Sequence, residues 1–193
     1  MTQANPLKRQ DNLKSVLGVC LLTVAALILG WVLMSGVTGR TVQVSQSGVS
    51  ASVPAGWKVT YGLQGEEVLF WTADQLDPTH RYTATMMPAV PGGNIKDVAF
   101  VRILDRGQNI NNYQVISQEI GKINGLDGYK VYYAYIQSGS TGMLPKVIQG
   151  VDFYLPQGEK VLIITLEDES SAFNRSLNAF QNFVETVRYT AGG

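Results

Sequence analysis

The sequence contains very few of the residues that build metal centres and covalent active sites. Among its 193 residues there is one cysteine, Cys20, and one histidine, His80. A zinc site made of several cysteines or histidines is therefore excluded, and a Ser-His-Asp arrangement could use only His80. No G-x-S-x-G motif, phosphate-binding loop or dinucleotide fingerprint occurs. We therefore expect a protein that is not an enzyme, with no catalytic residue and no cofactor.

The chain also lacks an excess of either charge. Fifteen basic and fifteen acidic residues give a formal net charge of zero, and no basic stripe is present that would bind a nucleic acid. Beyond the apolar N-terminal segment there is no cysteine. A domain exported from the cytoplasm would therefore have to be stabilised by a hydrophobic core rather than by disulfides.

Charge is absent altogether from one long segment near the N-terminus. No charged residue occurs between Lys14 and Arg40, and most residues in this gap are apolar. A helix of about 20 such residues reaches about 30 Å, the thickness of the hydrocarbon core of a bilayer. The sequence therefore predicts a transmembrane helix over residues 15–39 and a lipid bilayer as a partner. The residues expected to contact lipid are Val16, Leu17, Leu21, Leu22, Val24, Leu27, Ile28, Leu29, Trp31, Val32 and Leu33.

The charges that flank this segment predict its orientation. Lys8, Arg9 and Lys14 precede it, whereas only Arg40 follows it closely. Because basic residues tend to stay on the cytoplasmic side, we expect residues 1–14 to form a cytoplasmic tail of a single-pass protein in the cell membrane. The domain that follows would then be extracytoplasmic. The alternative is a cleaved secretory signal, whose apolar region usually has only about 7 to 15 residues.

The rest of the chain predicts a single α+β domain over residues 49–191. Residues 40–48, rich in small polar residues, are interpreted as a linker or a frayed first strand. A tight turn is expected at residues 124–128. Residues 161–166 are apolar on both faces, which indicates a strand at the centre of a sheet. Strands are predicted to begin at residues 49, 57, 67, 81, 113, 129, 146 and 160.

Two segments have the periodicity of amphipathic helices. The first is expected to begin after Asn94 as its N-cap and to end at Gly107, with its inner face formed by Ile95, Val98, Ala99 and Arg102. The second is expected to be capped by Ser170 and to carry the apolar stripe Phe173, Leu177, Phe180, Val184 and Val187. Glu167, Asp168 and Glu169 are interpreted as charges at the start of this helix. This order of elements favours an antiparallel sheet flanked by helices.

Several of these segments resemble a known family. Val53-Pro54-Ala55-Gly56-Trp57-Lys58-Val59 is similar to the Pro-x-Gly-Trp entry of PsbP-like domains, a family that includes the PsbP subunit of photosystem II, the nuclear-transport factor Mog and DcrB-type proteins. Residues 113–116 leading to residues 123–129, a Gly-rich hairpin and a Phe-rich last helix ending in Val187-Arg188-Tyr189 follow in the order of that family. The resemblance covers residues 49–189 and implies an α/β/α sandwich.

The resemblance also implies a function, because members of this family are generally non-catalytic proteins that bind, stabilise or help to assemble larger complexes. We therefore expect an accessory or assembly subunit that docks on a larger membrane protein complex. The predicted anchor differs from soluble photosystem subunits. The alternative is a small-ligand or metal-binding module, for which Asp74, Asp77 and His80 share one loop, although such residues also serve ordinary turns. A further candidate surface is formed by Tyr129, Tyr132, Tyr133 and Tyr135, some of which could be exposed for binding a partner.

Overall fold

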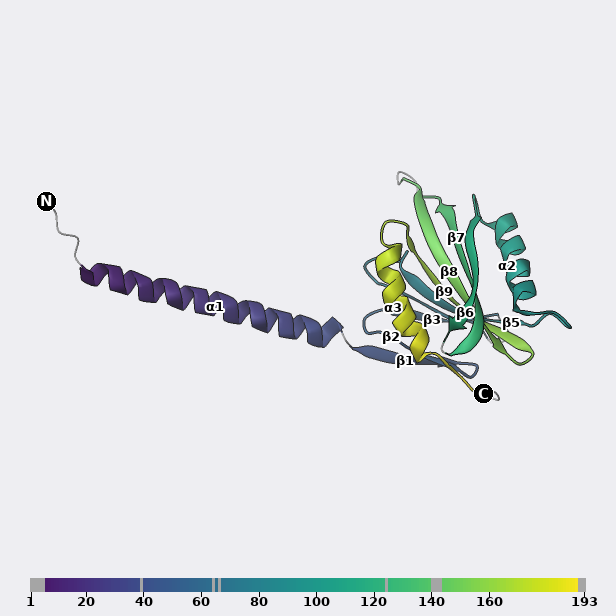
Figure 1. Ribbon diagram of the computed structural model, residues 1–193, viewed down its shortest axis with the longest axis horizontal. Coiled ribbons are helices and arrows are strands. Elements are labelled where there is room, and N and C mark those ends of the chain that lie inside the picture. Colours follow the sequence, from purple (N-terminus) through teal and green to yellow (C-terminus); the bar gives the residue numbers. More distant parts are fainter. Residues whose placement is uncertain are drawn as a thin grey trace. The chain divides into compact units, whose positions relative to one another are not determined.

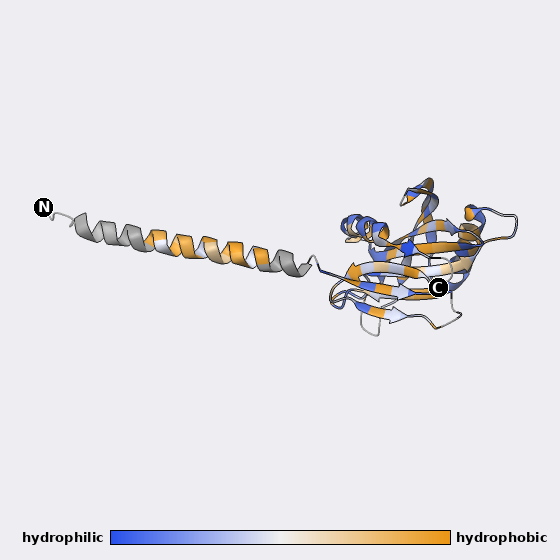
Figure 2. Cartoon of the chain, turned by 90° about the horizontal axis from the view of Figure 1, so that it is seen from below, coloured by the Kyte–Doolittle hydropathy of each residue, from blue (hydrophilic) through white to orange (hydrophobic). Residues whose placement is uncertain are grey.

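The computed structural model describes residues 6–38, 40–63, 65, 67–123, 125–139 and 144–190. The chain divides into two compact units, Met1–Thr41 and Val42–Gly193. The first unit contains the helix α1 (Pro6–Thr38), whose side chains are described for residues 16–32. All of these side chains are exposed, and Figure 2 shows hydrophobic residues along this part of the helix.

The predicted transmembrane span extends beyond the described side chains of α1. Leu33 and the other side chains of residues 33–39 lie outside them, as does that of Ser15. Within the described part of the chain, no helix combines the length and the apolar character needed to cross a membrane.

The second unit is an α+β domain with two antiparallel sheets (Figure 1). The larger sheet has seven strands in the order β3-β4-β5-β9-β8-β7-β6, and the smaller sheet has the order β1-β2-β10. Two helices complete the domain, α2 (Ile95–Asn109) and α3 (Phe173–Thr186). The strands are β1 (Thr41–Gln46), β2 (Val49–Pro54), β3 (Lys58–Tyr61), β4 (Val68–Ala73), β5 (Arg81–Pro88), β6 (Gln114–Ile123), β7 (Leu126–Gln137), β8 (Lys146–Gln157), β9 (Lys160–Glu169) and β10 (Arg188–Tyr189).

Strand β9 lies at the centre of the larger sheet, as its sequence predicts. It pairs with β5 along one side and with β8 along the other, so three strands lie beyond it in each direction. Residues 161–168 are all buried, because both faces of this strand are covered. The run of apolar residues at positions 161–164 follows from this two-sided burial.

Helix α3 and the small sheet cover one face of the larger sheet, which we call the α3 face (Figure 1). Phe173, Phe180, Phe183 and Val184 of the helix enter the same core as Val49 and other residues of β2. The sheet contributes alternate residues to this core, because successive side chains of a strand point to opposite faces. These residues include Phe70, Ala84, Phe153, Leu155, Leu162, Ile164 and Leu166.

Helix α2 covers the opposite face, which we call the α2 face (Figure 1). Its buried residues Val98 and Ala99 pack with Tyr129, Val131, Tyr154, Val161 and Ile163 of the sheet. The predicted cap is confirmed, because the Asn94 side chain accepts a hydrogen bond from the Lys96 backbone and the Asp97 carboxylate accepts one from the Asn94 backbone. Helices on both faces of the sheet agree with the expected α/β/α arrangement.

The segment interpreted as a linker or a frayed first strand contains a strand. Residues 41–46 form β1, which makes a hairpin with β2 and lies at the edge of the small sheet. The hairpin turn is formed by Ser47 and Gly48, with φ angles of 49° and 79°. Two left-handed residues in succession match the twist of a two-residue hairpin. The compact unit therefore begins at Val42, ahead of the predicted boundary at residue 49.

Three local predictions are corrected at the ends of elements. Helix α2 does not end at Gly107, because it continues to Asn109. Helix α3 begins at Phe173 after Ala172 and has no side-chain cap, and the Ser170 hydroxyl instead contacts Gln149. The turn predicted over residues 124–128 is shorter, because Ile123 pairs directly with Leu126 and residues 127–128 already belong to β7.

Glu167, Asp168 and Glu169 are not charges of the first helical turn. All three lie in β9, because its pairing with β8 continues as far as the pair Glu169 and Ile148. Side-chain contacts retain them there: Glu167 binds Arg81, Asp168 accepts a hydrogen bond from Ser176, and Glu169 pairs with Lys146.

Candidate functional site

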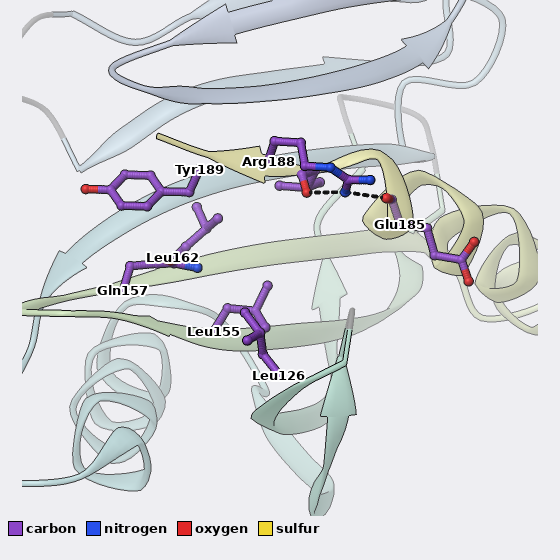
Figure 3. A pocket seen from close by; sticks show the side chains of 8 residues that line it. Leu126, Leu155, Gln157, Leu162, Glu185, Arg188 and Tyr189 are labelled. Carbon is purple, nitrogen blue, oxygen red and sulfur yellow. Dashed lines mark hydrogen bonds between the residues drawn. The ribbon is translucent and has the colours of Figure 1, made fainter. Parts of the chain in front are cut away.

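A concave groove lies at one end of the α3 face, between the last two elements of the chain and the larger sheet (Figure 3). Its volume is about 570 Å³. Residues from five elements line it: Leu126 of β7, Leu155 and Gln157 of β8, Leu162 of β9, Glu185 of α3, and Arg188 and Tyr189 of β10, together with Val187. This size is within the range of sites that hold small molecules or side chains of a partner.

The floor of the groove is apolar and rigidly held by the core. Leu155, Leu162 and Val187 are nearly completely buried, whereas Leu126 remains 48% exposed at the rim. In Figure 3, Leu126, Leu155 and Leu162 point toward the side on which Arg188 and Tyr189 lie. The Arg188 guanidinium turns back along the chain and donates hydrogen bonds from Nη1 to the carbonyls of Glu185, at 2.6 Å, and Val187, at 2.9 Å.

A second hollow of about 220 Å³ adjoins the first one at Glu185. Lys122, Lys130 and Gln181 line it together with Phe153. The Lys130 ammonium lies 4.9 Å from the centre of the Phe153 ring, over its face. Between residues 6 and 190, as far as the structure describes them, no carboxylate lies within salt-bridge distance of Lys122, Lys130 or Arg188. In the pairing of β6 with β7, Lys122 lies opposite Asp127 and Lys130 lies opposite Glu119. The charges around the two hollows are therefore mixed.

On the opposite side of the sheet, a buried network of charged residues joins α2 to the strands. Asp152 of β8 is 1% exposed and receives two hydrogen bonds from Arg106 of α2, at 2.6 and 3.2 Å. The hydroxyls of Thr165 and Tyr154 also donate to this carboxylate, at 2.6 and 3.2 Å. Arg102 lies 3.4 Å from it without hydrogen-bond geometry, so it adds charge rather than a directed bond. A buried charge is tolerated when it is paired and hydrogen-bonded, as this carboxylate is.

The network continues from Arg106 to a second carboxylate. The Arg106 guanidinium lies 4.4 Å from the centre of the Tyr133 ring, and the Tyr133 hydroxyl donates to Glu167 at 2.9 Å. Arg81 binds the other oxygen of Glu167 through Nε at 2.6 Å. Gly150 permits this arrangement, because a Cβ at that position would lie 2.3 Å from the Tyr133 ring. These contacts hold α2 on the sheet.

Burial determines how the groups of this network ionise. Burial alone would raise the pKa of Asp152, but the charges of Arg106 and Arg102 and the hydrogen bond from Thr165 outweigh it, so the pKa lies below its ordinary value. Burial raises the pKa of Tyr133 and Tyr154 well above the ordinary value. Burial and the neighbouring Glu167 raise the pKa of Tyr135 to about 12.

We expect the domain to lose stability in alkali because of these tyrosines. A raised pKa in the folded state means that the neutral form is favoured there, so this stabilisation is complete below about pH 10, the value in unfolded chains, and declines above it. Absorbance of tyrosinate should therefore rise together with unfolding between about pH 10 and 12. Tyr154→Phe should keep the packing and show a weaker decline with pH. Tyrosinate formation in a chain that stays folded would contradict the expectation.

Solved structures show where this arrangement of elements has been seen before. The solution structure of cyanobacterial PsbP (CyanoP) from Synechocystis sp. PCC 6803 superposes with a TM-score of 0.59 at 13% sequence identity, covering 78% of this chain and 92% of that one. The chain has a PsbP-like fold. The Ran-binding protein Mog1p from Saccharomyces cerevisiae shares this PsbP-like fold, with a TM-score of 0.53 at 9% identity over 78% of this chain and 95% of that one.

The PsbP-like fold expected from the sequence is thereby confirmed. No protein-family model matches the sequence, and no curated protein matches it. At identities of 9% and 13% the likeness establishes the fold alone.

The loop proposed as a metal site is built as an ordinary turn. Asp77 accepts hydrogen bonds from the backbone and hydroxyl of Thr79, and Asp74 accepts one from the backbone of Leu76. The His80 ring packs against Trp57, with ring centres 4.8 Å apart. Of the residues that the structure describes, no three His, Cys, Asp or Glu side chains are placed to hold a metal ion.

The tyrosines of β7 do not form an exposed surface. Tyr129, Tyr133 and Tyr135 are buried on the α2 face, and Tyr132 is half-buried on the α3 face. Neither the groove nor the buried network was predicted from the sequence. A signal for the network was present, because Arg106 follows Arg102 by one helical turn on the inner face of α2 and Asp152 interrupts an apolar strand.

Proposed function

We propose that this chain is a non-catalytic accessory or assembly subunit that α1 anchors in a membrane and whose PsbP-like domain docks on a larger membrane protein complex. In this proposal the N-terminus is cytoplasmic and the domain is extracytoplasmic, in accord with the basic residues Lys8, Arg9 and Lys14 that precede the uncharged part of α1. The protein partner is suggested by analogy, since Mog1p, of the same fold, is a Ran-binding protein.

The observation that carries the proposal is the surface of α1. Every side chain from residue 16 to residue 32 is exposed, with Leu22 at 74% and Trp31 at 73%, and no charge interrupts the helix between Lys14 and Arg40. A helix that is apolar on all sides is stable only where an apolar environment covers it. The hydrocarbon core of a membrane is such an environment.

The anchor can be tested with charged substitutions in the full chain. Leu22→Arg combined with Leu29→Arg should move the protein from the carbonate-washed membrane fraction to the soluble fraction, because each central arginine costs about 2.5 to 3.5 kcal/mol on insertion. Leu76→Arg with Leu144→Arg is the matched control, since these leucines are 95% and 86% exposed on the domain. The control should remain with the membrane. Unmodified chain in the soluble fraction would refute the anchor.

Docking is tested separately on native membranes. After extraction in mild detergent, the full chain should migrate with an assembly much larger than itself. Migration as the chain alone, under conditions that keep neighbouring complexes intact, would contradict the docking part of the proposal.

A small-ligand module is a second candidate, favoured by the size of the groove. Saturable binding of a small molecule, weakened by substitution of Leu126 or Gln157, would support this candidate.

A further inference from the structure

We propose that two copies of this chain pair edge to edge through β6, with Ile120 of one copy directly opposite Ile120 of the other. The inference goes beyond the proposed function and does not depend on the anchor. Three features of the described residues carry it: the length of the open edge of β6, the direction of its backbone groups, and a register in which β6 is complementary to itself.

The two edges of the larger sheet differ in length. Strand β3 forms one edge with four residues, whereas β6 forms the other edge with ten residues (Figure 1). A long edge is a template for another strand, unless a short length, prolines or bulges prevent the pairing. Strand β6 contains no proline, and its irregularity lies near one end, between Val115 and Ser117. Residues 117–123 therefore form a regular open edge.

The hairpin that joins β6 to β7 determines which backbone groups face outward. Ile123 pairs directly with Leu126, and the closing pair of such a two-residue hairpin is hydrogen-bonded. Along an antiparallel ladder, hydrogen-bonded pairs alternate with pairs whose N–H and C=O groups point away from the partner strand. Gln118, Ile120 and Lys122 therefore direct their N–H and C=O groups away from β7.

These outward groups have no partner within the described part of the chain. Apart from the pairing with β7, no backbone hydrogen bond there involves residue 118, 120 or 122. The Ile120 side chain between them is 71% exposed. An added strand would satisfy the backbone groups and cover this side chain, so both features favour the same kind of occupant.

A second copy of β6 matches this edge in an antiparallel register centred on Ile120. In that register Ile120 pairs with Ile120, and Gln118 of each copy pairs with Lys122 of the other copy. Every outward-facing residue then exchanges two hydrogen bonds with another outward-facing residue. Glu119 lies opposite Gly121, so no two like charges face each other. This self-complementarity, which a two-fold interface requires, identifies a second copy as the occupant.

The neighbouring registers are less favourable. A register centred on Glu119 places two carboxylates directly opposite each other, which is destabilising. A register centred on Gln118 extends the pairing across the irregularity that follows Val115. Registers centred on Gly121 or Lys122 leave Gln118 without a partner inside β6. Only the register centred on Ile120 uses all the outward groups within residues 117–123.

The contact is tested by disulfide cross-linking of the full chain in detergent micelles. Because Cys20 is the one cysteine of the sequence, the variant Cys20→Ala with Ile120→Cys carries a single thiol, which lies on the two-fold axis. The Cα atoms of a hydrogen-bonded antiparallel pair are about 5.5 Å apart, a separation that a disulfide spans. Mild oxidation should therefore give a covalent dimer. The matched control, Cys20→Ala with Leu76→Cys, should remain monomeric although Leu76 is 95% exposed.

A charge exchange at the same position tests the symmetry. Ile120→Lys and Ile120→Glu each place like charges opposite each other, so each variant should self-associate at least about tenfold more weakly than the unmodified chain. An equimolar mixture of the two should form mixed dimers, because a lysine then faces a glutamate. Leu76→Lys should associate as the unmodified chain does. The measurement is sedimentation in detergent at micromolar chain concentrations, since a small interface of this kind forms weak complexes.

Four results would overturn the proposal. These are a monomeric unmodified chain at all the concentrations used, cross-linking through Ile120→Cys no greater than in the Leu76→Cys control, unchanged self-association of Ile120→Lys, or a mixture that associates no better than its components. Cross-linking of Ile120→Cys to a different protein in native membranes, without the dimer, would also assign the edge to another partner. Such a failure leaves anchoring and docking untouched, because membrane fractionation and co-migration are measured independently.

Discussion

Replacing Asp152 with alanine is expected to lower the free energy of unfolding by about 3 to 5 kcal/mol. The carboxylate is 1% exposed and holds Arg106 through two hydrogen bonds, with Arg102 3.4 Å away. Removing it leaves buried guanidinium charge without a counterion, and this costs much more than the pair itself contributes. The measurement is urea unfolding of the full chain in detergent, followed by circular dichroism.

The matched control for this prediction is Asp105→Ala on the same helix as Arg106. Asp105 is exposed and accepts a hydrogen bond from the Asn109 side chain, so the control should change stability by less than about 0.5 kcal/mol. Should Asp152→Ala fail to fold, the double variant Asp152→Leu with Arg106→Met should recover much of the loss, because neither charge then remains buried alone. A loss in Asp152→Ala no greater than that of the control would contradict the role given to this pair.

Replacing Phe180 with alanine is expected to lower the free energy of unfolding by about 3 to 5 kcal/mol. Phe180 is completely buried where α3 meets the sheet, with ring centres 5.1 Å from Phe153 and 5.3 Å from Tyr82. The loss combines the lost transfer free energy of the ring with the cavity that remains. It is measured by the same urea unfolding.

Phe100 offers a matched control for the loss of the same side chain. It lies on the outer side of α2 and is 60% exposed, so Phe100→Ala should change stability by less than about 0.5 kcal/mol. Equal losses in the two variants would show that α3 does not provide the main core contact of its face.

The periodicity of apolar residues was sufficient to predict the elements in which that periodicity is strong. The stripe of Phe173, Phe180 and Val184 places α3 against the sheet, and the run of apolar residues at 161–164 places β9 at its centre. In both cases the pattern depends on which sides of one element are buried. The spacing of apolar residues in a short stretch of sequence is enough to show which sides these are. The order of such elements indicated an α+β domain, and the PsbP-like fold was implied by the resemblance of segments such as residues 53–59 to that family.

The ends of elements were less predictable, because two local solutions competed there. Ser170 with Asp168 and Glu169 has the composition of a helix start, but pairing with β8 keeps residues 168 and 169 in β9. The composition of residues 41–46 left a linker and a first strand as alternatives, and pairing with β2 makes them the strand β1. In each case the deciding hydrogen bonds come from a different segment of the chain, which a local pattern does not contain.

The amino-acid sequence by itself determined the uncharged segment between Lys14 and Arg40, the alternation that makes the strands, the inner faces of α2 and α3, and the scarcity of residues for metal or covalent chemistry. Only the tertiary structure decided that Arg106 meets Asp152, 46 residues away, and that residues from β7, β8, β9 and β10 share one groove. The physical reason is that burial by a neighbouring layer leaves a repeating pattern in the sequence. A contact between two particular side chains depends on strand order and register, which are set by the packing of the whole domain.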